Sequence, residues 1–362
     1  QFRLPIESPK KAFKTSGPKL TVSTNGDNLS ASSSKVNFVF NRKTGIVTSY
    51  KVDGTEYFSE GFGIQPNFWR APTDNDYGNG MPKRLQVWKE SSKNFNVTDA
   101  TVTMDGNNAV VNVNYLLPAG NLYIVNYTIY PSGAVNVAAR FTSTDMDAAQ
   151  TEVSEATRTA TFTPGRDAAR KEASKLNVPR IGVRFRLPAS MNQVEYFGRG
   201  PAENYLDRNA GSMIGLYKST AEELYFPYVR PQENGHHTDT RWVSLSTGKK
   251  GLLIQADNTI GFNALRNSIE DFDDEEATGL PRQWSNFTPE QVANHDEAAA
   301  KSVLRRQHHI NDITPRDFVE VCVDLKQQGV AGYDSWGSRP EPAYTLPANR
   351  EYNWGFTLIP LK

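Results

Sequence analysis

The sequence has almost no cysteine, no net charge and no long apolar run. Its only cysteine is Cys322, so it can form neither an internal disulfide nor a cysteine metal cluster. The 40 basic and 40 acidic residues give a formal net charge of zero. This balance argues against nucleic acid or an anionic membrane as the main partner, because both favour a basic face. No apolar stretch approaches the ~20 residues of a membrane span, and no signal-peptide pattern is present.

The chain also lacks an initiating methionine. It opens on Gln1, so we interpret it as an excised or processed piece of a protein. A localisation signal of the parent is not visible in this sequence, which leaves the compartment, periplasmic or cytoplasmic, open.

Helical patterns and repeats are scarce as well. No self-similarity at a period of roughly 20–50 residues is evident, which disfavours a propeller or a solenoid. Two short helices are predicted, at 167–176, which is rich in Ala, Lys and Glu, and from a Thr-Pro-Glu cap at 288 to about 301. Both lie in long polar stretches, so we expect them in surface insertions.

Strand patterns, by contrast, recur along the whole chain. Apolar residues alternate with polar ones and are separated by Gly, Pro, Asn and Asp, which predicts an all-β sandwich or barrel rather than βαβ units. The aromatic content of 11% suits a large β core and equally suits sugar-stacking surfaces. The predicted strands are 35–40, 46–52, 109–116, 122–130, 134–141, 181–187, 242–245, 251–255, 318–325 and 352–358.

The chain divides into a short N-terminal attachment and one large β domain. Residues 1–6 resemble an isolated strand, and residues 7–18 are rich in Pro, Lys, Ser and Gly, as linkers are. The predicted boundaries are therefore 1–18 for the attachment and 19–362 for the β domain.

Four dense polar and aromatic segments carry the candidate chemistry, at 68–76, 196–208, 227–242 and 329–337. In the first, Arg70 can clamp Asp74 or Asp76 and so hold an irregular loop rigid. Carboxylates in loops often serve caps and turns in this way.

The second and third segments combine Arg, Glu, Asn and aromatic residues. This set can bind sugar hydroxyls through paired hydrogen bonds and stack on the apolar face of a sugar. Their Gly and Pro residues are equally consistent with rigid turns locked by salt bridges, and the sequence leaves both interpretations open. The candidate groove residues are Arg70, Asp74, Glu203, Asn204, Arg208, Glu233, Asn234, His236 and Arg241.

In the fourth segment, glycines flank a tryptophan soon after a strand. We therefore expect Trp336 on a loop, where an exposed ring usually contacts a ligand or a partner. Asp334 lies two residues before it.

The four segments, in this order, resemble one family. Phe-Trp-Arg-Ala-Pro-Thr-Asp-Asn-Asp, Gly-Arg-Gly-Pro-Ala-Glu-Asn-Tyr-Leu-Asp-Arg, Tyr-Val-Arg-Pro-Gln-Glu-Asn-Gly and Tyr-Asp-Ser-Trp-Gly are similar to the C-terminal small-chain domain of glycoside hydrolase family 2 β-galactosidases. Gln-Phe-Arg-Leu-Pro at the start resembles the end of the immunoglobulin-like domain that precedes it. The resemblance covers essentially the whole chain and implies a large antiparallel β-supersandwich of the galactose-mutarotase type.

The resemblance also implies an accessory role. In this family a separate (β/α)₈ barrel supplies two catalytic glutamates, and this chain has neither the helices nor the room for such a barrel. We therefore expect no catalytic residue in this chain, and no turnover by the chain alone. Trp336, with Asp334, would contact the β-galactoside.

The implied partners are the upstream barrel and β-galactoside sugars, within a parent that forms a homo-oligomer. No cofactor or metal is expected in this part, since the Mg or Na of the parent family binds elsewhere. Relative to compact family members, 145–179 and 270–301 look like insertions. The acidic run 270–276 lacks the ligand spacing of a calcium loop, so we interpret it as a solvated loop.

Two other functions remain open. An independent carbohydrate-binding module would use the candidate groove without the barrel. A sugar epimerase would need a base and an acid on opposite faces of the sugar, and its candidates are Glu233, His236, His237, His308 and His309. The pair His236-His237 is also a departure from the family pattern.

Overall fold

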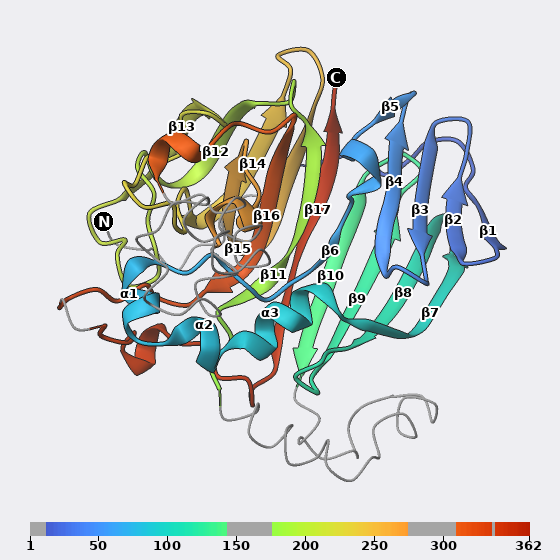
Figure 1. The fold of residues 1–362 in the computed structure, drawn as a ribbon. Helices are drawn as coiled ribbons and strands as arrows, with labels where there is room; N and C mark the ends of the chain where they lie inside the picture. Colours follow the sequence, from blue (N-terminus) through green and yellow to red (C-terminus); the bar gives the residue numbers. More distant parts are fainter. Residues whose placement is uncertain (1–11, 143–175, 274–308, 335–336) are drawn as a thin grey trace, which may run out of the picture.

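The computed structural model describes residues 12–142, 176–273, 309–334 and 337–362, and antiparallel strands are their main secondary structure (Figure 1). The strands are β1 (Thr21–Asn25), β2 (Asn28–Ser32), β3 (Val36–Asn41), β4 (Ile46–Val52), β5 (Thr55–Glu56), β6 (Gln65–Asn67), β7 (Asn96–Asp105), β8 (Asn108–Leu116), β9 (Leu122–Ile129), β10 (Val135–Thr142), β11 (Arg180–Pro188), β12 (Gln193–Gly200), β13 (Met213–Thr220), β14 (His237–Ser246), β15 (Gly251–Leu265), β16 (Phe318–Gln327) and β17 (Tyr352–Leu361). The predicted all-β antiparallel fold is confirmed.

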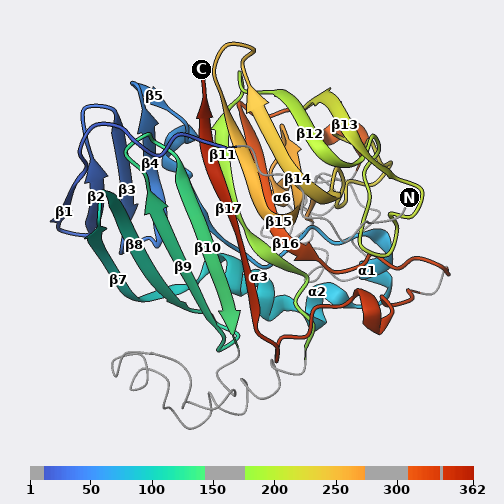
Figure 2. The same ribbon diagram turned by 180° about the vertical axis from the view of Figure 1, so that it is seen from behind.

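These strands form two sheets. The smaller runs β1-β2-β3-β4-β5, and the larger runs β13-β12-β14-β15-β17-β10-β9-β8-β7. Strand β16 pairs with β15 and with β11, and β11 pairs in turn with β6. Figures 1 and 2 show the smaller sheet lying against β7–β10. The four predicted polar segments adjoin strands at the other end of the larger sheet, namely β6, β12, β14 and β16.

Aromatic side chains join the two sheets. Alternation along β3 buries Phe38 and Phe40, and the rings of Phe38 and Tyr127 lie 5.6 Å apart. The Tyr50 hydroxyl donates to the Gly133 carbonyl across the interface at 2.6 Å. Since successive side chains of a strand point to opposite faces, each inner face supplies a row of such contacts. The two sheets therefore share one core.

All ten predicted strands correspond to strands of the structure. The strands not predicted are β1, β2, β5, β6, β7, β12 and β13. Several are short or lie at an edge, where little apolar alternation is needed: β1 lies at the edge of the smaller sheet and leaves most of its side chains exposed.

A helical region at 74–93, the longest in the part of the chain that the structure describes, was not predicted. It comprises α1 (Asp74–Gly78), α2 (Met81–Arg84) and α3 (Gln86–Lys93), so the expectation of helices only in the insertions is wrong for this region. In α3 the buried face consists of Trp88, Ser91 and Ser92, and both serine hydroxyls donate to carbonyls one turn earlier. Buried serines conceal the apolar periodicity by which helices are recognised.

The remaining helices of the described residues are short, of three or four residues each. They are η1 (Ser59–Gly61), α6 (Ile269–Phe272), η3 (Ile310–Asp312) and η4 (Pro342–Tyr344). The predicted strand at 1–6 and the predicted helix at 288–301 lie outside the described residues, as does nearly all of the helix at 167–176. Within the described part, no helix is long and apolar enough to cross a membrane.

The end of the predicted linker packs on the β domain. The Phe13 and Tyr130 rings meet edge to face at 5.5 Å, and the Ser132 amide donates to the Thr15 carbonyl. The boundary at residue 18 stays a prediction.

Candidate functional site

The structure brings the four predicted segments into mutual contact. The first follows β6 and enters α1, the second is the end of β12 with the loop after it, the third leads into β14, and the fourth follows β16. Asn75 of the first and Asp207 of the second both hydrogen-bond to Val330 of the fourth. Asp74 of the first pairs with Arg230 of the third at 3.1 Å.

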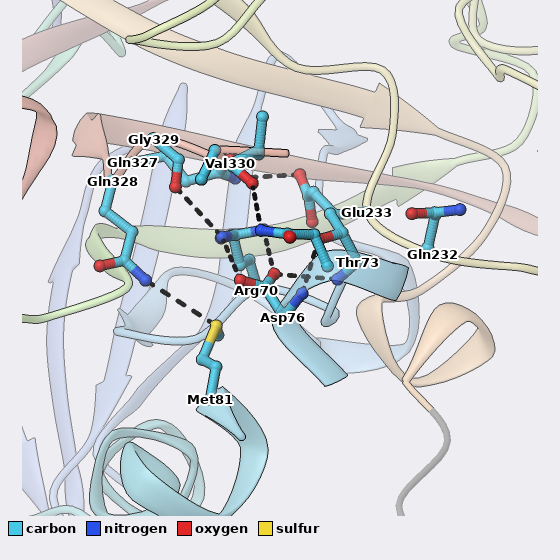
Figure 3. Close-up of polar contacts among 12 residues, drawn as sticks. Arg70, Thr73, Asp76, Met81, Gln232, Glu233, Gln327, Gln328, Gly329 and Val330 are labelled. Atoms are coloured by element: carbon cyan, nitrogen blue, oxygen red, sulfur yellow. Dashed lines mark hydrogen bonds and ion pairs between the residues drawn. The ribbon is translucent and has the colours of Figure 1, made fainter. Parts of the chain in front are cut away.

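The first segment is fixed by a buried ion pair. Arg70 is fully buried, and its Nη1 lies 2.8 Å from Asp76 Oδ2, while its Nη2 donates to the Gly329 carbonyl at 3.3 Å (Figure 3). Asp76 also closes a capping box with Thr73 at the start of α1. Of the two predicted partners of Arg70, the structure therefore selects Asp76.

The loop at 329–338 is held at both ends. The two carboxylate oxygens of Asp207 accept from the amides of Val330 and Ala331, at 3.0 and 2.8 Å. Asn75 Nδ2 donates to the carbonyls of Val330 and Ser338, at 3.2 and 2.7 Å. The backbone of this loop is thus anchored by side chains from two distant segments.

The two predicted sugar contacts lie on this loop. Asp334 is exposed, and its Oδ1 accepts from the Ser338 amide at 3.2 Å. Trp336 lies outside the described residues, so its placement stays a prediction.

Behind the loop lies a sealed polar cluster centred on Glu233. This side chain is only 5% exposed and accepts from Arg180 Nη2 at 3.3 Å, Asn263 Nδ2 at 3.1 Å and Gln327 Nε2 at 2.9 Å. Figure 3 shows Glu233 beside Gln327, with Gln328 reaching the sulfur of Met81. Gln327 and Gln328 directly precede Gly329, so the cluster fixes the point where the loop begins.

Two titratable groups complete the sealed cluster. Arg180 Nε lies 3.2 Å from Asp324 Oδ2, and burial raises the pKa of Asp324 to about 7 although the Arg180 charge opposes this. Burial, reinforced by the Arg180 charge, lowers the pKa of His236 to about 3. His236 Nδ1 lies 2.9 Å from Asn263 Oδ1. Since Asn263 Nδ2 faces Glu233, we assign the Asn263 oxygen as acceptor and the proton of neutral His236 to Nδ1.

The second segment is held in the same manner. Glu203 has a side chain that is 7% exposed, and it accepts from Arg208 Nη2, the Tyr228 hydroxyl and the Gly235 amide. Asn204 is fully buried and accepts from the Thr238 amide and hydroxyl. These hydrogen bonds link the second segment to the third.

The predicted groove residues therefore fall into two groups. Those with buried side chains, each bound by other protein groups, are Arg70, Glu203, Asn204, Glu233, Asn234 and His236. Asp74 and Arg208 reach the surface, with exposed side-chain fractions of 58% and 56%, and Arg241 lies half-buried over the Phe197 ring. A sugar could contact the first group only by displacing its present partners.

Asp207 and Asn75 were not singled out from the sequence, although both lie inside the segments that were. No spacing rule relates Asp207 to Val330, since 123 residues separate them. Within residues 12–142, 176–273, 309–334 and 337–362, no group of three or more His, Cys, Asp or Glu side chains could hold a metal ion.

Comparison with known proteins gives one family. The family described as β-galactosidase small chain matches residues 32–358. A β-galactosidase of Priestia megaterium is 31% identical over all of this chain, which covers 29% of that protein. A β-galactosidase of Streptococcus thermophilus is 25% identical over 99% of the chain and 29% of its own length. The chain thus spans less than a third of these relatives.

A shorter relative matches over most of its length. The β-galactosidase small subunit of Latilactobacillus sakei is 27% identical, over 89% of this chain and 92% of that protein. Among solved structures, a galactose 1-epimerase from Lactobacillus acidophilus covers 94% of the chain and 98% of its own, with a TM-score of 0.42 and 7% identity. With the family match extending over residues 32–358, the chain belongs to the β-galactosidase small-chain family.

Proposed function

We propose that this chain is the accessory part of a β-galactosidase, that it docks on a catalytic part encoded outside this sequence, and that its 329–338 loop completes the sugar site. The observation that carries the proposal is that the first and second segments hold the backbone of that loop, while the third segment joins these two. Asp207 and Asn75 hold its backbone, and Arg70 holds its first carbonyl.

The state of the acidic residues supports a non-catalytic role. A glycosidase needs two carboxyl groups that face the sugar from about 5 to 9.5 Å apart, one of them free to transfer a proton. In the described residues, Glu203 and Glu233 are each occupied by an arginine and by further donors, and Asp324 faces Arg180. These acids act as acceptors for protein groups.

Exposed apolar side chains around the start of the third segment support docking. Val229 is 78% exposed, Phe226 48% and Ile310 37%, and the Ile310 amide donates to the Val229 carbonyl at 3.0 Å. On the loop itself, Tyr333 is 58% exposed. Large exposed apolar side chains that lie together typically mark an interaction surface. We assign this surface to the catalytic part of the enzyme.

In the assembled enzyme, Asp334 and Trp336 contact the β-galactoside. An aromatic ring offers the flat apolar surface on which a sugar stacks, and a carboxylate accepts hydrogen bonds from sugar hydroxyls. The assembled enzyme is a homo-oligomer whose two glutamates reside in the catalytic part.

Complementation tests this function. The purified chain is assayed on a chromogenic β-galactoside alone, and then with a catalytic part that lacks this segment. We expect no turnover by the chain alone, restored turnover on mixing, and weaker restoration by the Trp336→Ala variant. Turnover by the chain alone that disappears on changing one of its own glutamates would refute the accessory role, as would mixing without any gain.

The epimerase alternative receives no support from the described residues. Glu233, His236 and His237 are 5%, 1% and 1% exposed, so none of them reaches a sugar. His308 lies outside the described residues, and His309 is a surface residue near Asp312.

The binding-module alternative is tested by titrating the chain with galactose and lactose while following tryptophan fluorescence. Saturable binding that the Trp336→Ala variant loses would identify a preformed sugar site in the chain alone. The accessory role predicts no binding up to high millimolar sugar.

A further inference from the structure

Asp207 is placed to control the backbone of the 329–338 loop. It lies between β12 and β13, and each of its carboxylate oxygens accepts one backbone amide, from Val330 at 3.0 Å and from Ala331 at 2.8 Å. Hydrogen bonds from amides to an ionised carboxylate are stronger than neutral ones. Among the described residues, only backbone amides of the loop donate hydrogen bonds to this carboxylate.

The loop backbone is pressed against this carboxylate. A Cβ atom built on Gly329 would lie 2.4 Å from Asp207 Oδ2, so a side chain at 329 would displace the carboxylate from its present position. The backbone φ of Ala331 is 53°, a left-handed conformation that is unfavourable for a residue with a side chain. The Asp207 carboxylate binds the amide of this strained residue and the amide just before it.

The far end of the loop is closed by α1. Asn75 bridges the carbonyls of Val330 and Ser338, and a Cβ on Gly337 would lie 2.5 Å from the backbone of Gly78. Between the two anchors, the Ser338 amide donates to Asp334, which ties the exposed carboxylate to the anchored end.

We propose that Asp207 is a positioning residue of the enzyme. By binding the Val330 and Ala331 amides, it sets the direction in which the loop leaves β16 and so places Tyr333 and Asp334 for the reaction. This inference rests on the proposed function of the loop. Asp207 itself does not touch the sugar, because its carboxylate is occupied by the loop backbone.

The first test uses the chain alone. Asp207→Asn keeps the shape of the side chain but turns one acceptor oxygen into an NH₂ group, which faces an amide donor. Glu56→Gln is the matched control, since Glu56 also accepts two backbone amides, those of Tyr50 and Phe58, in the smaller sheet. Amide hydrogen exchange is measured by mass spectrometry on peptides covering 329–338 and on peptides from β3 and β4.

We expect Asp207→Asn to accelerate exchange in the 329–338 peptides about tenfold or more and to leave β3 and β4 unchanged, because loops open locally at a cost below that of global unfolding. Glu56→Gln should leave exchange in the 329–338 peptides unchanged, because both amides share Glu56 Oε1 and the glutamine carbonyl can keep accepting from them. Unchanged exchange at 329–338 in Asp207→Asn overturns the proposal. Acceleration everywhere overturns it too, since Asp207 would then support the whole domain.

The second test is a double-mutant cycle in the assembled enzyme, with Asp207→Asn, Trp336→Ala and the pair. A positioning role predicts that Asp207→Asn raises KM about tenfold, changes kcat less, and adds little in the Trp336→Ala background. Independent, additive losses overturn it. If Trp336→Ala alone changes nothing, the proposed function of the loop fails, while the exchange result still decides whether Asp207 holds the loop.

Discussion

Two polar clusters lie next to each other in this protein. They share residue types but have different structural roles. The sealed cluster joins Arg180, Glu233 and Asp324 and is almost without solvent contact. The loop-anchoring cluster joins Asp207 and Asn75 to backbone groups of an exposed loop. Burial, and not residue type, separates a cluster that supports the core from one that presents a loop.

The energetic consequences differ accordingly. In the sealed cluster each charge depends on a counter-charge, because an unpaired buried ion is costly. In the loop-anchoring cluster each bond holds a segment that water can reach. Damage to the first should lower the stability of the whole domain, and damage to the second should remain local.

Removal of the arginine at the centre of the sealed cluster should have the largest effect. Arg180→Met leaves Glu233 and Asp324 buried without their positive partner, and we expect a loss of about 3–5 kcal/mol in the free energy of unfolding. Urea denaturation followed by circular dichroism measures it. Arg140→Met, which breaks a partly exposed pair with Glu351, should cost less than about 1 kcal/mol. Equal losses would erase the distinction between sealed and exposed pairs.

The next effect is a pH dependence from the same cluster. The pKa of His236 is about 3 in the folded chain, against about 6.5 when unfolded. Below pH 6.5 the unfolded state gains a proton that the folded state cannot, so stability falls by about 1.4 kcal/mol per pH unit. Between pH 6.5 and 4.5, the native chain should lose about 2–3 kcal/mol more than His236→Gln. Parallel losses in urea titrations at the two pH values would contradict the sealed, neutral histidine.

A glycine pair tests the loop-anchoring cluster. Gly332 and Gly337 both have positive φ, of 88° and 77°, but an added Cβ meets nothing within 4 Å at Gly332 and backbone of Gly78 at 2.5 Å at Gly337. Gly337→Ala should therefore lower the free energy of local loop opening by about 1–3 kcal/mol more than Gly332→Ala does. The free energy of global unfolding should change little in either variant. Hydrogen exchange of the 329–338 peptides measures the difference. Matching exchange in both variants would mean that the contact with α1 does not hold the loop.

The sequence revealed most of the sheet and little of the site, for physical reasons that particular elements make clear. Strands such as β3 bury one face, so alternation predicts them. In β15, only 251–255 was predicted, because exposed residues at 257 and 258 interrupt the apolar pattern before the strand continues to Leu265. Helix α3 was missed because serines occupy its buried face.

Within the site, local pairs were predictable and distant ones were not. The clamp of Arg70 on Asp76 spans six residues and follows from the first segment alone. The contact of Asp207 with the loop, and that of Arg180 with Asp324, depend on how the loops and strands of the larger sheet come together. The polar segments could therefore be located from the sequence, but which of their side chains are buried could not.

The smallest effect should come from the surface pair that borders the loop. Asp74 and Arg230 lie 3.1 Å apart with exposed side-chain fractions of 58% and 39%, so solvent screens their attraction. A double-mutant cycle with Asp74→Ala and Arg230→Ala should give a coupling of about 0.2–1 kcal/mol that falls as salt is raised to 1 M.

Arg230→Ala should cost more than Asp74→Ala, because Arg230 also lies 4.1 Å over the Tyr77 ring and loses that cation–π contact of about 0.5–1 kcal/mol. A coupling above 2 kcal/mol that ignores salt would show that this pair behaves as a sealed one. Exposure would then no longer separate the two clusters, and the interpretation of the loop as a locally anchored element would have to be abandoned.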